Sequence, residues 1–265
     1  MAVDIAIIGG TGVYDPAMLD DVQVREIKTP YGVVSLQVGR YRGQEIAFLA
    51  RHGAGHSVPP HLVNYRGNIW ALKKLGVSQI IATTAVGSLN EKMRPNELVV
   101  PDQFLDFTKG RPSTFFEGGD SGVIHTDFTN PYCHRLCKLL MTAAYGLNVP
   151  THEGGVYVCT EGPRFETPAE IRMFRQLGGD LVGMTSIPEA VLAREAEMCY
   201  ATLSIVTNYA AGISPNNLTH MEVVDAMADN IEKLRRVLFR AIELIEAQVD
   251  CECQHALAEF GGFKL

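Results

Sequence analysis

The sequence predicts an α/β protein: a single domain with a central mixed, largely parallel β-sheet flanked by helices on both faces. Short apolar runs bounded by glycine and proline alternate along the 265-residue chain with longer segments of helical periodicity. This alternation is typical of layered α/β folds. Three segments also carry the Ser/Thr-x-x-Glu capping box that starts helices, namely residues 167–170, 186–189 and 219–222.

The expected strands are short and mostly apolar. The first, Ile5 to Ile8, is followed by Gly9-Gly10-Thr11-Gly12, and this pattern indicates a buried strand that leads into a tight turn. Apolar content and bounding turn residues predict further strands at 22–28, 33–39, 45–50, 79–85, 98–100, 104–107, 155–160, 181–184 and 200–206.

Helices are expected between these strands. One spans about 60–75 and is stopped by Gly76, and another begins at Asn130-Pro131, an N-cap followed by proline at the first helical position. The last capping-box helix carries a long apolar stripe at Val223, Val224, Met227, Ile231, Leu234, Leu238, Ile242 and Ile245. Residues 106–127 are polar and are interpreted as a candidate mobile loop. Without an internal repeat or linker, we expect one domain over 1–250 and a tail over 251–265.

Composition limits the classes of partner. The chain is 46% hydrophobic and 20% charged with a net charge of −7, which is ordinary globular composition and disfavours nucleic acid or an anionic membrane as a partner. No apolar run approaches the roughly 20 residues of a spanning helix. No basic region precedes the first apolar run, so no signal peptide is expected. Six scattered cysteines fit a reducing cytoplasm.

Polar residues at the ends of several predicted strands form a candidate anion site. In open α/β sheets, the carboxyl ends of strands line the ligand crevice. Thr11 lies in the glycine turn, Arg51 follows another strand, and hydroxyl residues end two more, in 83–85 and 183–186. Each signal has an ordinary alternative, such as a plain tight turn or a solvated arginine. A dinucleotide fingerprint is disfavoured because GxGxxG is absent.

Histidines and cysteines add candidates with weaker signals. His56 follows the arginine in a glycine-containing loop and either positions an anion or lies at the surface. Cys251 and Cys253 with His255 make a poor three-ligand metal site, or a strained reactive disulfide, or a tail without a catalytic role, which we favour. Cys133 and Cys137, one helical turn apart, are expected to be packing residues.

Taken in order, six segments resemble the trimeric purine nucleoside phosphorylase and methylthioadenosine phosphorylase family. The resemblance extends from Ile5 to about Ala247 and predicts the nucleoside phosphorylase fold. Its segments are IGGTG (8–12), ARHG (50–53), VNYRGNIWALK (63–73), TTAVGSL (83–89), EGPRFET (161–167) and GMTSIPEAVLARE (183–195).

The resemblance implies an enzyme that uses inorganic phosphate to cleave a nucleoside into free base and α-ribose 1-phosphate, without a metal or other cofactor. Met184 is expected under the ribose and Phe165 near the base, whose edge Glu166 and Asn208 bind. His125 is expected to reach a neighbouring subunit's site in a homotrimer or dimer of trimers. The implied phosphate site contains Thr11, Arg51, His52, Thr84, Ala85 and Thr185, with His56 placed to position the attacking phosphate.

The base-binding pair indicates the 6-oxopurine branch. A 6-oxopurine presents an N1–H donor and an O6 acceptor, and a carboxylate accepts where a carboxamide both donates and accepts. The methylthioadenosine branch typically has serine at the position of Glu166 and aspartates at those of Asn208 and Ala210. We therefore expect inosine and guanosine to be preferred to adenosine.

The 5′ end of the nucleoside leaves alternatives open. His220 lies where methylthio-specific enzymes have an apolar residue, so it either hydrogen-bonds a 5′-hydroxyl or faces solvent. The second candidate is therefore S-methyl-5′-thioinosine phosphorylase, followed by methylthioadenosine phosphorylase. A different class, a nucleotide-binding module without turnover, is distinguished by phosphate-dependent release of hypoxanthine.

Overall fold

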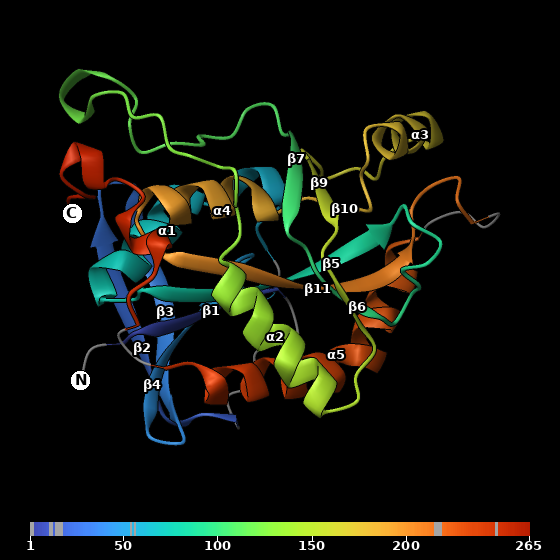
Figure 1. Ribbon diagram of the computed structural model, residues 1–265, viewed down its shortest axis with the longest axis horizontal. Coiled ribbons are helices and arrows are strands. Elements are labelled where there is room, and N and C mark those ends of the chain that lie inside the picture. Colours follow the sequence, from blue (N-terminus) through green and yellow to red (C-terminus); the bar gives the residue numbers. More distant parts are fainter. Residues whose placement is uncertain are drawn as a thin grey trace.

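The computed structural model describes residues 3–10, 13, 18–53, 55, 57–214, 219–246 and 249–265, with the side chains of 220, 222 and 229 outside the description. An 11-stranded sheet forms its centre (Figure 1). The strands are β1 (Ile5–Gly9), β2 (Asp20–Thr29), β3 (Gly32–Tyr41), β4 (Gln44–Ala50), β5 (Gln79–Ser88), β6 (Leu98–Val100), β7 (Gln103–Phe107), β8 (Thr151–Glu153), β9 (Val156–Thr160), β10 (Leu181–Gly183) and β11 (Cys199–Tyr209). The helices are α1 (Tyr65–Leu75), α2 (His134–Gly146), α3 (Pro168–Gln176), α4 (Ser186–Glu195) and α5 (His220–Leu244).

The sheet is mixed and largely parallel, as predicted. Its main path runs β2-β3-β4-β1-β5-β10-β9-β7, and β11 adds to β5 while β6 and β8 extend from β11. The central strand β1 is parallel to both β4 and β5, and β5 is parallel to β11. The hairpin strands β2, β3 and β4 pair antiparallel.

Helices cover both faces because the side chains of a strand alternate between the faces of the sheet. Ile5 and Ile7 belong to a buried cluster with residues of α2 and α5, whereas Ala6 and Ile8 belong to a second cluster with residues of α1 and α4. In Figure 1, α1 and α4 lie along the upper side of the central strands and α5 along the lower side. Among the described helices, even the 25-residue α5 lacks an apolar stretch long enough to cross a bilayer.

Two predicted helices start later than expected. Residues 60–62 form a separate 3₁₀ turn, and α1 begins after Asn64, whose side chain accepts a hydrogen bond from the Gly67 amide. The helix expected at Asn130 begins at His134 instead, after Cys133. Gly76 does end α1, in the left-handed conformation (φ 99°) that favours glycine.

The polar stretch 106–127 and the tail are both anchored to the domain. Within the stretch, Arg111 and Phe115 are buried. Phe263 of the tail packs against Phe115, with ring centroids 5.2 Å apart, and against Trp70 at 5.3 Å. The loop expected to be mobile is therefore fixed at its middle, and the end of the chain covers it.

Candidate active site

A cavity of about 670 Å³ lies at one end of the central strands, with residues of α5 on one wall. The position of the cavity follows from the strand pairing along one edge of β5. β1 pairs with β5 only as far as Ala82, and β10 pairs with it only at Gly87 and Ser88. Within the described residues, neither β1 nor β10 pairs with residues 83–86 on that edge, and residues 83–86 line the cavity. The site thus occupies the gap where one neighbour ends and the next begins, as is usual in open α/β sheets.

Most of the predicted site residues meet in this cavity. From the phosphate set, Arg51, His52, Thr84, Ala85 and Thr185 line it, and from the nucleoside set, Phe165, Glu166, Met184, Asn208 and Ala210 line it. Thr11 and His56 lie outside the described residues. Thr84 and Ala85 were expected at the end of a strand, but β5 continues to Ser88, so they lie inside a strand at an uncovered edge.

Arg51 is buried and held in one orientation. Its Nε donates to Glu189 Oε2 at 2.8 Å, its Nη2 donates to Glu189 Oε1 at 2.7 Å, and its Nη1 donates to the Thr83 carbonyl at 2.9 Å. Burial alone would lower the pKa of Arg51, but the charge and hydrogen bonds of Glu189 outweigh it and raise the pKa. The guanidinium therefore stays charged, and its remaining N–H groups are suited to an anion.

Other polar groups at this end of the cavity have fixed orientations. His52 Nδ1 lies 2.8 Å from the Val58 carbonyl, and since a carbonyl only accepts, Nδ1 carries the proton. The Thr84 hydroxyl pairs with Ser204 at 2.8 Å. The buried Thr83 hydroxyl has no hydrogen-bond partner among the described residues, so it is an additional candidate donor to a ligand.

Asn208 defines the opposite end of the cavity. The register of β11 against β5 shifts between Val206 and Asn208, and such a bulge redirects side chains. Asn208 Oδ1 accepts from the Thr207 hydroxyl at 2.7 Å, and Nδ2 donates to the Tyr209 carbonyl at 2.9 Å. Because Nδ2 has two N–H groups, the second one is available to a ligand.

Glu166 lines the same cavity and is partly buried. Its Oε1 accepts a hydrogen bond from the Thr160 hydroxyl at 2.6 Å. Burial raises the pKa of Glu166, and the Thr160 hydrogen bond opposes this shift by stabilising the carboxylate. An ionised Glu166 is therefore a pure acceptor in a partly dry environment.

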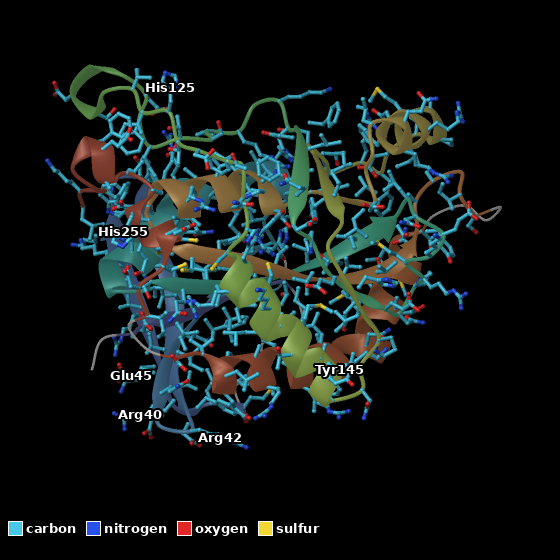
Figure 2. All side chains as sticks on the ribbon, viewed as in Figure 1. Arg40, Arg42, Glu45, His125, Tyr145 and His255 are labelled. Atoms are coloured by element: carbon cyan, nitrogen blue, oxygen red, sulfur yellow. The ribbon has the colours of Figure 1, made fainter. Side chains whose placement is uncertain are left out.

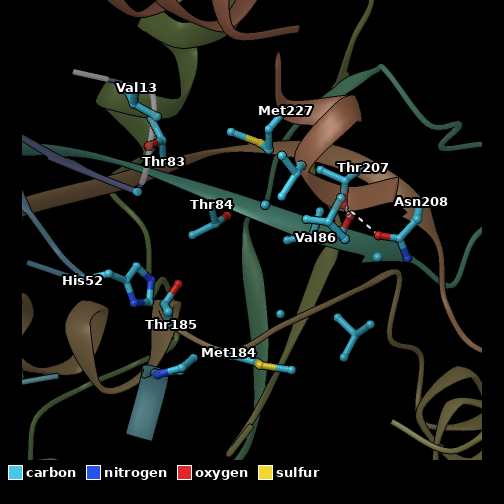
Figure 3. Close-up of a pocket in the computed structure, with 18 of the residues that line it drawn as sticks. Val13, His52, Thr83, Thr84, Val86, Met184, Thr185, Thr207, Asn208 and Met227 are labelled. Atoms are coloured by element: carbon cyan, nitrogen blue, oxygen red, sulfur yellow. Dashed lines mark hydrogen bonds between the residues drawn. The ribbon is translucent and has the colours of Figure 1, made fainter. Parts of the chain in front are cut away.

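Apolar side chains separate the two polar ends. Figure 3 shows His52, Thr185 and Thr84 on one side, Thr207 and Asn208 on the other, and Val86 and Met184 between them. Residues of α5 complete the wall: Val223, Val224, Met227, Ala228, Ile231 and Leu234. All of these except Ala228 belong to the apolar stripe predicted from the sequence, so part of that stripe faces the cavity.

Sequence reasoning missed Arg111, which braces two walls of the site. Its Nη1 donates to the carbonyls of Met184 and Ile187, at 2.6 and 2.9 Å. Its Nη2 donates to the carbonyls of Thr160 and Glu161, at 3.1 and 2.6 Å. Glu189 was also missed, because its role depends on a contact with Arg51 across 138 positions of sequence. Only the burial of a charged residue inside an apolar helix stretch could have pointed to it.

Two predicted site residues, His125 and His220, are not found among the described residues that line the cavity. His125 is exposed on the loop labelled in Figure 2 and is not among the residues that line the cavity of its own chain. His220 is the first residue of α5, and its side chain lies outside the description.

The fold and the cavity define a class: an α/β protein with a large pocket that is lined by a buried arginine, a carboxylate and a carboxamide. The family model of the phosphorylase superfamily matches residues 4–243. The chain belongs to this superfamily, and it groups there with purine nucleoside and methylthioadenosine phosphorylases. The resemblance seen in the sequence is confirmed.

Individual relatives match over nearly the whole chain. The chain is 57% identical to a "Probable 6-oxopurine nucleoside phosphorylase" of Dictyoglomus turgidum, over 97% of each chain. It is 52% identical to a "Probable S-methyl-5'-thioinosine phosphorylase" of Methanothermobacter thermautotrophicus, over 96% of this chain and 88% of that one. Its fold is similar to a crystal structure of methylthioadenosine phosphorylase from an antarctic soil metagenomic library, with a TM-score of 0.91 at 40% identity over 97% of this chain and 92% of that chain.

Proposed function

We propose that the protein cleaves 6-oxopurine nucleosides, inosine and guanosine, with inorganic phosphate, giving the free base and α-ribose 1-phosphate for purine salvage. The observation that carries this proposal is a single cavity lined by the Glu166 carboxylate, the Asn208 carboxamide and the buried Arg51. Relatives named as 6-oxopurine nucleoside phosphorylases support it. The reaction needs no metal or other cofactor, since phosphate is the nucleophile.

Phosphate is positioned by the Arg51 end of the cavity. The proposed donors are the remaining N–H groups of the guanidinium, the hydroxyls of Thr83, Thr84 and Thr185, and the His52 ring, all of which line the cavity. Thr11 and His56 complete the proposed set. Holding the dianion beneath C1′ of the nucleoside supplies the proximity part of catalysis, because it makes the attack effectively intramolecular.

The leaving purine is stabilised at the other end. As the glycosidic bond breaks, negative charge develops on the purine, and the free Nδ2–H of Asn208 can donate to N7 or O6. Donors fixed in advance stabilise such charge without reorganisation, and the Thr207 and Tyr209 contacts fix Asn208. Glu166 accepts the N1–H of the base, which only a 6-oxopurine offers. Met184 lies between the two ends, where the ribose belongs.

The direct test is to incubate the protein with inosine, with and without phosphate, and to measure hypoxanthine and ribose 1-phosphate. We expect both products in equal amounts and only with phosphate. Release of hypoxanthine without phosphate would indicate hydrolysis, and no release from any purine nucleoside would leave a binding module as the better account.

The apolar wall from α5 favours S-methyl-5′-thioinosine as a second candidate substrate. Val223, Met227 and Ile231 line the cavity, and a methylthio group would bury apolar surface there. His220, at the start of the same helix, is the proposed partner of a 5′-hydroxyl. His220→Ala should therefore lower kcat/KM for inosine more than for methylthioinosine, and equal losses would remove this role.

We further propose a cytoplasmic homotrimer or dimer of trimers, in which His125 completes the cavity of a neighbouring subunit. The exposure of His125 outside its own cavity supports this arrangement. Light scattering should give a mass that is a multiple of three chains. Mixing His125→Ala with Arg51→Ala subunits should restore activity if the histidine acts in the adjacent site, and no restoration would assign it to its own chain.

A further inference from the structure

Four cysteines from three distant parts of the chain converge in the folded protein. Cys133 precedes α2, Cys199 is the first residue of β11, and Cys251 and Cys253 lie in the tail. Their four sulfur atoms all lie within 4.8 Å of one another, and the Cys133 and Cys251 sulfurs are 3.8 Å apart. None of the four lines the substrate cavity, so this thiol cluster is a separate feature.

The fold holds Cys133 and Cys199 through their own amides, and it holds Cys251 and Cys253 through the tail that carries them. The Cys133 amide donates to the Tyr200 carbonyl and the Cys199 amide to the Ser78 carbonyl, both at 2.8 Å. The tail is fastened by Glu197, whose two carboxylate oxygens accept from the amides of Leu257 at 3.0 Å and Phe263 at 2.9 Å. The cluster therefore forms without a disulfide bond between the four sulfurs.

The geometry fits a tetrahedral metal ion. Zinc binds thiolates at about 2.3 Å, which places the sulfurs of a tetrahedral site about 3.8 Å apart. The Cys133–Cys251 pair already has this separation, and no other pair exceeds it by more than about 1 Å. The cluster contains four sulfur ligands and no carboxylate or imidazole, a ligand set that selects zinc over magnesium or calcium.

The surroundings suit the charge of such a site. Zinc bound by four thiolates carries a net charge of −2, and Arg135 Nη2 lies 3.9 Å from the Cys199 sulfur. Gln79 Oε1 holds the same nitrogen at 2.5 Å, while the buried Nε of Arg135 has no hydrogen-bond partner among the described residues. Cys133, Cys199 and Cys253 are buried, and the partly exposed Cys251 leaves a route for the ion.

We propose that Cys133, Cys199, Cys251 and Cys253 bind one zinc ion that fastens the C-terminal tail to the domain. On binding, the four thiols lose four protons and zinc gains four Zn–S bonds, with no change of oxidation state. His255, the ligand weighed from the sequence, is not part of this set, because its Nε2 pairs with Asp250 at 2.5 Å. Two residues that sequence spacing did not connect, Cys133 and Cys199, replace it.

The test uses the full-length protein, purified under anaerobic, reducing conditions. Elemental analysis should give one zinc per chain, and replacement by cobalt(II) should produce the intense visible bands of a tetrahedral thiolate site. Cys253→Ser should lose both signals. Cys137→Ser, one helical turn from Cys133 but outside the cluster, should keep both and is the matched control.

Arg135→Gln provides a variant that keeps all four ligands. Loss of a supporting group around a metal typically weakens binding about 10–100-fold, so its zinc affinity should fall by this factor while the cobalt spectrum keeps its shape. Zinc should also raise the Tm of the wild type relative to protein treated with a chelator. Less than one zinc per chain after reconstitution with excess ion, no cobalt spectrum, or purified chains lighter by the four hydrogens of two disulfides would overturn the proposal.

Discussion

Both carboxylate oxygens of Glu189 accept hydrogen bonds from the Arg51 guanidinium, with N–O distances of 2.7 and 2.8 Å. Neither side chain is more than 1% exposed. The pair fixes the cation that faces the anion end of the cavity. Tyr200 adds a third contact by donating to Glu189 Oε1 at 2.9 Å. A charge held this deeply inside the protein depends on its partner for both stability and orientation.

Glu189→Ala is therefore expected to destabilise the protein by about 3–5 kcal/mol, because it leaves an uncompensated buried charge. Urea unfolding followed by circular dichroism measures this loss. The exposed pair of Arg175 and Glu91, 3.6 Å apart with side chains 44% and 73% exposed, provides the control, and Glu91→Ala should cost no more than about 1 kcal/mol. Equal costs for the two substitutions would mean that the buried pair is unimportant.

Gly87 leaves room for the Asn208 amide. A Cβ at Gly87 would lie 3.2 Å from Asn208 Nδ2 and 3.3 Å from Val182 Cγ1, so Gly87→Ala should displace the amide. Complete loss of one preorganised donor costs roughly 100-fold in kcat, and we expect a partial loss of about 10-fold for inosine. Gly146→Ala, with nothing within 4 Å of the new Cβ, should leave kcat unchanged. An unchanged kcat in Gly87→Ala would argue against the placement of Asn208.

The fall of kcat/KM at low pH should reflect the protonation of Glu166. Its active form is the carboxylate, so kcat/KM for inosine falls as pH decreases through its raised pKa. Thr160→Val removes the hydrogen bond that lowers this pKa, and the acid limb should move to higher pH. Thr142→Val, which removes an exposed helix hydroxyl bonded to Lys138, should not move it. A shift toward lower pH in Thr160→Val would contradict the assignment.

Replacing both base-binding side chains, Glu166 and Asn208, should change the preferred purine. Asn208→Asp with Glu166→Ser replaces the pair by an acceptor and a hydroxyl, which can pair with the amino group and N1 of a 6-aminopurine. The ratio of kcat/KM for inosine to that for adenosine should fall by about 10-fold or more, since each mismatch costs roughly 1–3 kcal/mol. An unchanged ratio would place the base elsewhere in the cavity.

Much of this site was predictable because strand order and chemistry coincide. Arg51 follows β4, and β4, β1 and β5 are parallel, so their carboxyl ends lie at one edge of the sheet. Thr185 follows β10, which is antiparallel to β5 and leads back along its uncovered residues. Asn208 and Glu166 were predicted from a family resemblance and the hydrogen-bonding needs of a purine. The structure places Asn208 at the bulge in β11, and it holds Glu166 through the Thr160 hydroxyl.

Other features could not be predicted, because they depend on contacts between distant segments. Arg111 looks like a polar loop residue, yet it binds four carbonyls in the walls of the site. Glu189 has the sequence pattern of a helix-capping residue, but its carboxylate is used by Arg51. The start of α2 at His134 similarly reflects tertiary contacts, since the Asn130 carbonyl accepts a hydrogen bond from Arg194.

We infer that Glu166 and Asn208 bind the hydrogen-bonding edge of a 6-oxopurine. The most direct test compares kcat/KM for inosine with kcat/KM for adenosine in the wild-type protein at saturating phosphate. Two mismatched polar groups of at least about 1 kcal/mol each predict a preference for inosine of roughly 30-fold or more. Equal rates, or faster cleavage of adenosine, would contradict the account.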